Sequence, residues 1–195
     1  MSHFNAGNVW GVVKDTKPGT SQGGKRFLGL HLDCSGAHGQ VNAFGRIWGD
    51  DQIESLQSFL KDHPHDPIRL RGYFSMFFAE VKLYNFTWWQ WEPLAGIERK
   101  AAFVLRGIVT GMKGMDAMGR ISLKLIRPGK NGQKDIKEEF DVYAEDPGMF
   151  AAVKEGDTVE VKGYLQQIED EFGANSGPAL PFIKAFKKIE SEPRL

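Results

Sequence analysis

The residues with the clearest chemical potential in this 195-residue sequence are aromatic and basic side chains that recur together in its first half. All five tryptophans lie before residue 95, and 15 of the 23 aromatic residues lie before residue 98. Flat rings can stack on planar groups, and cations between them can hold phosphates. This combination is what a single-stranded nucleic acid requires of a protein that binds it without sequence preference.

The predicted binding residues are aromatic rings and cations of the first half, with one cation from the second half. They are Lys14, Lys17, Lys25, Arg26, Phe27, Phe44, Arg46, Trp48, Arg71, Phe77, Phe78 and Arg120. The basic segment 14–26 is rich in Gly and Pro, so we expect a loop beside the binding surface, with a plain solvated loop as the alternative. Two phenylalanines at a predicted hairpin turn, 75–79, would contact either bases or another subunit.

Alternation along two predicted strands places some of these rings on the outer face. In the first strand, Leu28, Leu30 and Leu32 form an inward face, so Phe27, Gly29 and His31 point outward. In the second strand, Val41 and Ala43 are inward, so Asn42 and Phe44 are outward. Phe27 and Phe44 could then share one binding face. The competing interpretation, in which Phe44 belongs to the core, stays open.

The elements that must hold these residues occur twice in the chain, in the same order. The matching segments are 9–13 with 105–109, 25–32 with 119–125, and 68–74 with 159–165. In each half a segment with helical features precedes the last of these strands, at 53–60 and around 150–153, and Asp50 and Asp51 suit the start of the first helix. The last strands are expected at 84–91 and 181–189.

Five strands with a helix between the third and fourth is the order of an OB-fold, a five-stranded Greek-key barrel. The sequence therefore predicts an all-β protein of two tandem OB-fold barrels, at residues 1–95 and 100–190. We expect the first to be the main nucleic-acid-binding barrel and the second a supporting or oligomerisation barrel. A single sandwich of about ten strands is the alternative.

The segment Val41–Trp48 resembles the third strand of the bacterial single-stranded-DNA-binding proteins, which ends in Phe-Gly-Lys or Phe-Gly-Arg before a short helix. Segments 68–74 and 159–165 resemble the Val-x-Val-x-Gly-x-Leu strand of that family. The resemblance implies OB-folds that coat single-stranded DNA, with a base-stacking role for Phe44 and a basic role for Arg46. Some members carry two such barrels and dimerise, which implies a homodimer with four OB-folds.

The sequence also departs from that family. His38 stands where the family often has tryptophan, and the second half reads Phe140-Asp141-Val142 in place of the Phe-Gly-Arg signature. The chain ends Glu192-Pro193-Arg194-Leu195 instead of in a long glycine-rich tail with an acidic tip. These differences indicate a divergent relative and put recruitment of partners through a tail in doubt.

Composition excludes several other classes of protein. The 25 basic and 25 acidic residues balance, so any anion-binding surface must be local. The single cysteine, Cys34, allows no intrachain disulfide, and no apolar run reaches the length of a membrane span, so a cytoplasmic protein is expected. His63 and His65 flank a proline without further ligands nearby, which is weak support for a metal site. We expect no metal, cofactor or small-molecule substrate.

The resulting prediction is a non-catalytic protein that coats single-stranded DNA during replication, recombination or repair. The alternative is an OB-fold module for protein interaction or assembly that does not bind nucleic acid. A nuclease is a third hypothesis, but it needs clustered acids that the sequence does not show.

Overall fold

The computed structural model describes residues 4–36, 41–78, 82–96, 99–115, 118–127, 134–167 and 179–189. Within them the chain forms ten strands, one α-helix and one short 3-10 helix, so the prediction of a mainly β protein is confirmed. The chain divides into two compact units. Most of the first unit is Ala6–Phe103, and most of the second is Val104–Tyr164 with residues 181–189, so a few end residues of the strands assigned below to one unit group with the other.

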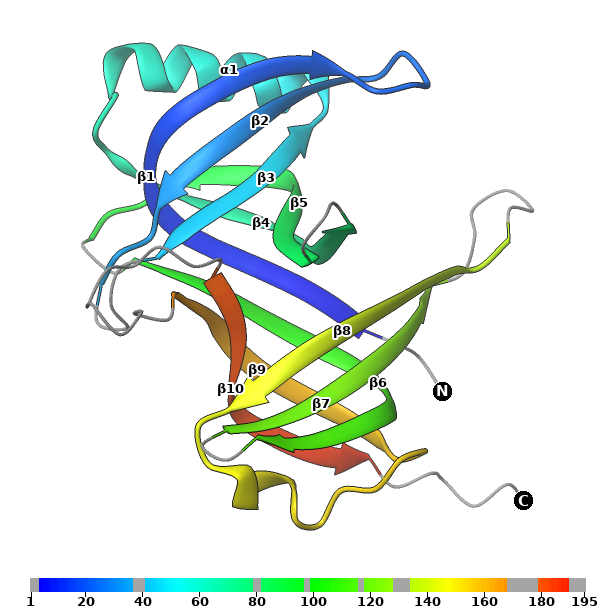
Figure 1. Ribbon diagram of the computed structural model, residues 1–195. Coiled ribbons are helices and arrows are strands. Elements are labelled where there is room, and N and C mark those ends of the chain that lie inside the picture. The colour runs from blue at the N-terminus through cyan, green and yellow to red at the C-terminus, as the bar shows by residue number, and fades with distance from the viewer. Residues whose placement is uncertain are drawn as a thin grey trace. The chain divides into compact units, whose positions relative to one another are not determined.

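The first unit is built from five strands and a helix between the third and fourth strands (Figure 1). In chain order they are β1 (Phe4–Thr20), β2 (Arg26–Asp33), β3 (Asn42–Trp48), α1 (Asp50–Asp62), β4 (Pro67–Phe78) and β5 (Lys82–Pro93). The strand order is β2-β3-β5-β4-β1, and β1 also pairs with β2, so the pairings close into a ring. The pairings are antiparallel except for β3 with β5, which is parallel.

Alternating apolar residues of these strands fill the inside of the ring. Leu28, Leu30 and Leu32 of β2 are all buried, as their spacing predicts. Phe74 of β4 is fully buried and packs against Phe103 with ring centroids 5.0 Å apart. Burying an aromatic side chain of this size removes a large apolar area from water, which makes such contacts a main source of stability.

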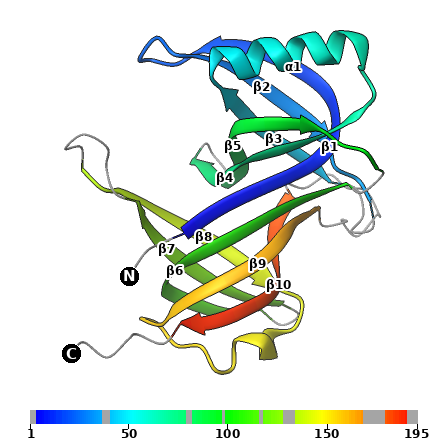
Figure 2. The same cartoon turned by 180° about the vertical axis from the view of Figure 1, so that it is seen from behind.

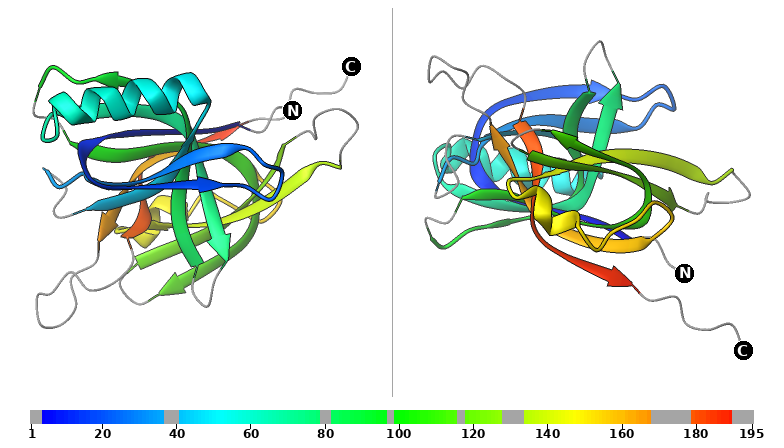
Figure 3. Two further views of the ribbon diagram at one scale, coloured as in Figure 1. Left: turned by 90° about the horizontal axis from the view of Figure 1, so that it is seen from above. Right: turned by 60° about the horizontal axis from the view of Figure 1, so that its bottom comes forward.

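Helix α1 packs against β2, β3 and β5, and Figure 3, left, shows the helix from above. Its apolar face buries Ile53 and Leu56, and Asp50 and Asp51 occupy its first turn, as predicted. Their carboxylates lie near the partial positive charge of the helix N-terminus, which favours this start point. No helix in the described part of the chain is long and apolar enough to cross a membrane.

Strand β1 is longer than the sequence pattern predicts, and Figure 1 shows it as a long bent ribbon. The predicted loop 14–26 is wrong over most of its length, because β1 continues to Thr20 and pairs with β2 as far as Thr20 opposite Arg26. A register shift between Val13 and Asp15 interrupts the alternation there, which hides the strand from a period-two pattern. The turn occupies only the residues around Ser21 to Lys25.

The hairpin of β4 and β5 also reaches further than expected. Strand β4 continues through Phe78, which pairs with Lys82, so the predicted turn at 75–79 is wrong. Phe77 and Phe78 lie in a paired strand, opposite Leu83 and Lys82. Figure 2 shows β4 and β5 from behind. Residues 79–81, between the two strands, lie outside the described residues.

The second unit repeats the strand order of the first. Its elements are β6 (Lys100–Met115), β7 (Met118–Arg127), β8 (Ile136–Ala144), η1 (Pro147–Phe150), β9 (Thr158–Gln167) and β10 (Ala179–Ile189). The order is β6-β7-β8-β10-β9, with β6 also paired to β9 and with β8 parallel to β10. The 3-10 helix η1 packs on β7 and is brought forward in Figure 3, right. Asp146 begins it by accepting a hydrogen bond from the Gly148 amide at 2.8 Å.

Several predicted features fall on residues that the structure does not describe. They are His38, the acidic hairpin turn at 169–177, and the final residues 191–195.

The single cysteine, Cys34, is buried in the first unit, and this burial raises the pKa of its thiol to about 12.

The glycine at position 72 provides a test of how β4 and β5 fit together. A Cβ atom there would overlap the carbonyl oxygen of Thr87 and lie 2.8 Å from the Trp88 Cα atom. Because both are backbone atoms, Gly72→Ala should lower the free energy of unfolding by about 1–3 kcal/mol. Urea unfolding followed by circular dichroism measures this change. Gly23→Ala is the matched control, since no atom lies within 4 Å of a Cβ at that position; equal midpoints for the two variants would contradict the prediction.

Candidate nucleic-acid interface

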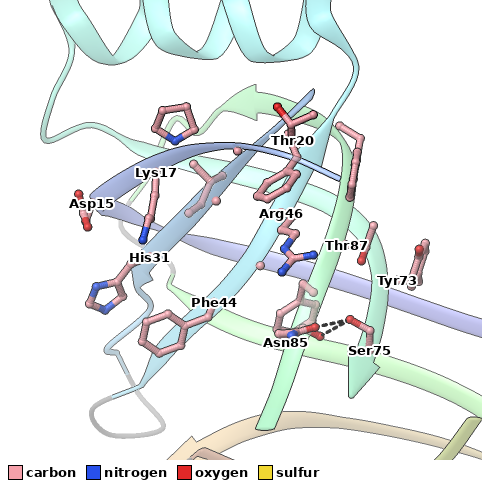
Figure 4. A pocket seen from close by; sticks show the side chains of 18 residues that line it. Asp15, Lys17, Thr20, His31, Phe44, Arg46, Tyr73, Ser75, Asn85 and Thr87 are labelled. Carbon is pink, nitrogen blue, oxygen red and sulfur yellow. Dashed lines mark hydrogen bonds between the residues drawn. The ribbon is translucent and has the colours of Figure 1, made fainter. Parts of the chain in front are cut away.

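An open groove of about 800 Å³ lies on the outer face of the first unit (Figure 4). Its lining comes from β1 between Asp15 and Thr20, from β2, from β3, and from the facing parts of β4 and β5. The residues that line it are therefore mostly the outward positions of strands whose inward positions form the core.

One wall of the groove carries a stacked pair of rings. The rings of His31 and Phe44 lie 4.5 Å apart at 18°, and the two residues are opposite each other in the β2–β3 register. His31 Nε2 lies 2.9 Å from Asn42 Oδ1, a hydrogen bond that fixes the imidazole plane. Phe44 is 50% exposed, so the open interpretation is settled: Phe44 is not a core residue. Its ring is held on one side and open to a ligand on the other.

A second aromatic cluster lies further along the same two strands. Phe27 and Trp48 are opposite each other, with ring centroids 5.2 Å apart. The Arg46 guanidinium lies over the Phe27 ring at 4.6 Å. Gly19 lies against the Phe27 ring, where any side chain would collide with it. The missing side chain lets β1 approach the ring closely, and Phe27, Trp48 and Arg46 all line the groove.

The opposite wall of the groove is polar. Ser75 Oγ donates a hydrogen bond to Asn85 Oδ1 and lies 3.2 Å from the Asn85 carbonyl oxygen. Tyr73 and Thr87 lie beside them, and Figure 4 shows Tyr73 across the groove from His31 and Asp15. Aromatic rings on one wall and hydroxyl and amide groups on the other suit a ligand with flat faces and polar edges.

The charge in the groove is locally positive although the chain is neutral overall. Its charged lining residues are Lys17 and Arg46, against the single carboxylate of Asp15. Lys14 lies on β1 close to Asp33, with Nζ 3.6 Å from Oδ2. Burial acts to raise the pKa of Asp33, but hydrogen bonds from Ser35 and the nearby Lys14 and Arg99 hold that pKa below its ordinary value. Asp33 is therefore ionised at neutral pH and partly neutralises Lys14.

Lys25 and Arg26 lie at the turn between β1 and β2. They line a second hollow of about 490 Å³, and Trp48 lines both this hollow and the groove. Arg26 also forms ion pairs with α1, at 3.3 Å to Asp50 and 3.7 Å to Glu54. Both pairs are well exposed, so they constrain the side chain only weakly.

Arg71 and Arg120, which were also predicted, do not line the groove. Arg71 forms a 3.1 Å ion pair with Glu92, which also binds Arg69, and does not line the groove. Arg120 lies in the second unit, 3.8 Å from Asp141. Phe77 and Phe78 have described backbones, but their side chains lie outside what the structure describes. The groove thus brings together Lys17, Phe27, Phe44, Arg46 and Trp48 of the predicted set.

The outward positions of β7 and β8 in the second unit carry different chemistry. Ser122 Oγ donates a 2.6 Å hydrogen bond to the buried carboxylate of Asp141, and Thr110 donates one of 2.7 Å to Glu139. Glu139 and Asp141 of β8 lie opposite Lys124 and Ser122 of β7. Phe44 and Arg46 of β3 hold the corresponding positions, opposite His31 and Gly29 of β2. The face of β7 and β8 is occupied by internal hydrogen bonds and ion pairs.

Sequence reasoning missed the contribution of the β4–β5 hairpin to the groove, namely Tyr73, Ser75, Asn85 and Thr87. The alternation of polar residues at 73, 75, 85 and 87 was a usable signal, but it identifies a groove wall only once the parallel pairing of β3 with β5 is known.

The histidines considered as metal ligands lie on the connection after α1, where His63 Nδ1 lies 3.0 Å from Asp66 Oδ2. Across the described residues, no three His, Cys, Asp or Glu side chains gather as metal ligands.

No protein-family profile and no curated protein matches the sequence. Among solved structures, the wild-type single-stranded DNA binding protein from Thermus aquaticus is similar over 100% of this chain and 97% of its own, with a TM-score of 0.67 and 17% identity. The p204 HINb domain covers 96% of this chain and 99% of its own at a TM-score of 0.29 and 10% identity. The Ifi202 HINa domain in complex with 20 bp dsDNA covers 96% and 97% at a TM-score of 0.31 and 8% identity.

The similarity to the Thermus aquaticus protein extends over the full chain and confirms the predicted resemblance at the level of fold. The low sequence identity agrees with the expectation of a divergent relative. The chain therefore has a fold like that of a bacterial single-stranded-DNA-binding protein.

Proposed function

We propose that this protein coats single-stranded DNA, without catalysis, by stacking bases on the rings of the first-unit groove and holding phosphates with its cations. The observation that carries the proposal is the exposed Phe44 ring, fixed by His31 on one side and open on the other, in the same groove as Arg46. A ring that is already oriented loses little conformational freedom when a base stacks on it. The full-length fold similarity supports the same function.

The energetics are sufficient without a net positive charge. Stacking one base on an aromatic side chain is worth about 1–3 kcal/mol. Phe44 and the Phe27–Trp48 pair provide separate stacking surfaces, and Lys17 and Arg46 lie among them. Two or three stacked bases with a few phosphate contacts give useful affinity and leave the bases unread, which suits a protein that covers strands of any sequence.

The two units are proposed to be tandem OB-fold barrels, at 1–95 and 100–190, with different roles. The closed ring of pairings and the parallel third and fifth strands of each unit support this assignment. The first barrel binds DNA, with Lys14, Lys25 and Arg26 extending the phosphate path at the β1–β2 end. The second barrel supports it or joins two chains as a homodimer with four barrels. Arg71 and Arg120 contribute to DNA binding from outside the groove, and Phe77 and Phe78 contribute from β4.

Replacing Phe44 tests the stacking surface. Phe44→Ala should weaken binding of a fluorescein-labelled oligothymidine by about 1–3 kcal/mol, measured by fluorescence anisotropy. Because the ring is half exposed and stacked on His31, its loss should lower the free energy of unfolding by no more than about 1.5 kcal/mol. Ile136→Ala is the matched control, since Ile136 is 47% exposed and lies in the second unit. Unchanged DNA affinity in Phe44→Ala would contradict the proposal.

The phosphate role of Arg46 has its own signature in salt dependence. Each phosphate contact to a single strand adds about 0.7 to the slope of log K against log salt concentration. Arg46→Ala should reduce that slope by about 0.7, while Arg46→Lys should keep it because the positive charge remains. Lys162→Ala removes a 64%-exposed cation of the second unit and should leave the slope unchanged. The same slope in Arg46→Ala and the wild type would show that Arg46 holds no phosphate.

An assembly module that does not bind nucleic acid is the second candidate, and the exposed Phe44 and Trp89 favour it because apolar rings on a surface also suit protein contacts. Phe44→Ala separates the two functions. Under this second function the substitution changes the mass measured by light scattering or the stability, and no oligonucleotide binds to the wild type.

A further inference from the structure

A β-bulge in the hairpin of β4 and β5 exposes a tryptophan that regular strand pairing would not place there. Arg71 lies opposite Gln90 and Gly72 lies opposite Trp88, so Trp89 is the extra residue of the bulge. Trp88 is fully buried, whereas Trp89 is 52% exposed. The bulge depends on Gly72, where a side chain would collide with the backbone at Thr87 and Trp88. Bulges of this kind often direct a side chain towards a functional site.

Trp89 lies next to the groove. Its ring centroid is 5.7 Å from that of Tyr73, at an interplanar angle of 36°, and Tyr73 lines the groove. In Figure 4, Tyr73 lies on the far side of the groove from His31. Trp89 therefore adjoins the Tyr73 wall of the groove, which faces the wall that carries His31 and Phe44.

The exposure of Trp89 is unusual for this molecule. The large hydrophobic side chains that stand out as exposed in the described part of the chain are Phe44, Trp89, Met112 and Ile136. The aromatic members are Phe44, in the groove, and Trp89, beside it. Glu92, further along β5, is held in ion pairs by Arg69 and Arg71 of β4. Trp89 is thus a flat, exposed ring, and this carboxylate of its own strand is already paired.

We propose that Trp89 is a base-stacking platform that extends the DNA path beyond the groove, past Tyr73. This inference rests on the proposed function and adds a contact to it. The occupant is a nucleobase of a strand that already fills the groove, because the Trp89 ring contacts Tyr73, which lines the groove. A strand long enough to pass Tyr73 stacks a base on Trp89, and a shorter strand does not reach it.

The experiment measures affinity as a function of oligonucleotide length in the full chain. Labelled oligothymidines from about 4 to about 16 nucleotides span the site sizes of single OB-folds. Trp89→Ala should bind the longer oligonucleotides about 5- to 150-fold more weakly than the wild type and the shortest ones equally well. Trp89→Phe should retain the length-dependent gain, whereas Trp89→Leu should lose it because leucine is apolar but not flat.

The outcomes separate this inference from the proposed function. If the wild type binds no oligonucleotide of any length, both fail. If the wild type binds and Phe44→Ala weakens it, but Trp89→Ala matches the wild type at every length, the Trp89 inference is overturned and the proposed function stands. An equal loss at every length also overturns it, since the contact is then not an extension. Unchanged binding with a changed mass by light scattering assigns Trp89 to a contact between copies and overturns it as well.

Discussion

The cross-strand register between β2 and β3 determines the chemistry of the first unit's outer face. Phe27 opposite Trp48, Gly29 opposite Arg46 and His31 opposite Phe44 bring rings and a guanidinium together on one surface. A shift of one residue in β2 would turn its three leucines to the face in contact with water. The same shift in β3 would expose Ala43 and Ile47. The burial of Leu28, Leu30 and Leu32 therefore holds the binding face in register as well as stabilising the core.

The sequence predicted this part of the structure well because the information is local. Strict alternation along 27–32 identifies the inward leucines without knowledge of the rest of the fold. The length of β1 could not be predicted in the same way, since its second half is a strand only through pairing with β2, and the register shift after Val13 interrupts the pattern. The faces of Trp88, Trp89 and Trp91 were also beyond prediction, because one bulged residue changes the alternation between them.

The two units show how one strand order can carry different surface chemistry. In the first unit the outward residues of β3 are an exposed ring and an arginine stacked on phenylalanine, and both remain accessible to a ligand. In the second, the outward residues of β8 include acids that hydrogen bond to Ser122 and Thr110 of their own unit. A chain with no net charge can thus hold a locally cationic, aromatic groove, because Lys17 and Arg46 line it against the single carboxylate of Asp15.

Intrinsic tryptophan fluorescence during titration with an unlabelled oligothymidine is the sharpest test of base stacking in the groove, since Trp48 lines the groove and its emission reports a base stacked nearby. Base stacking beside Trp48 should give saturable quenching at low salt that is reversed as the salt concentration rises. An unchanged emission spectrum, together with no salt-sensitive binding, would contradict it.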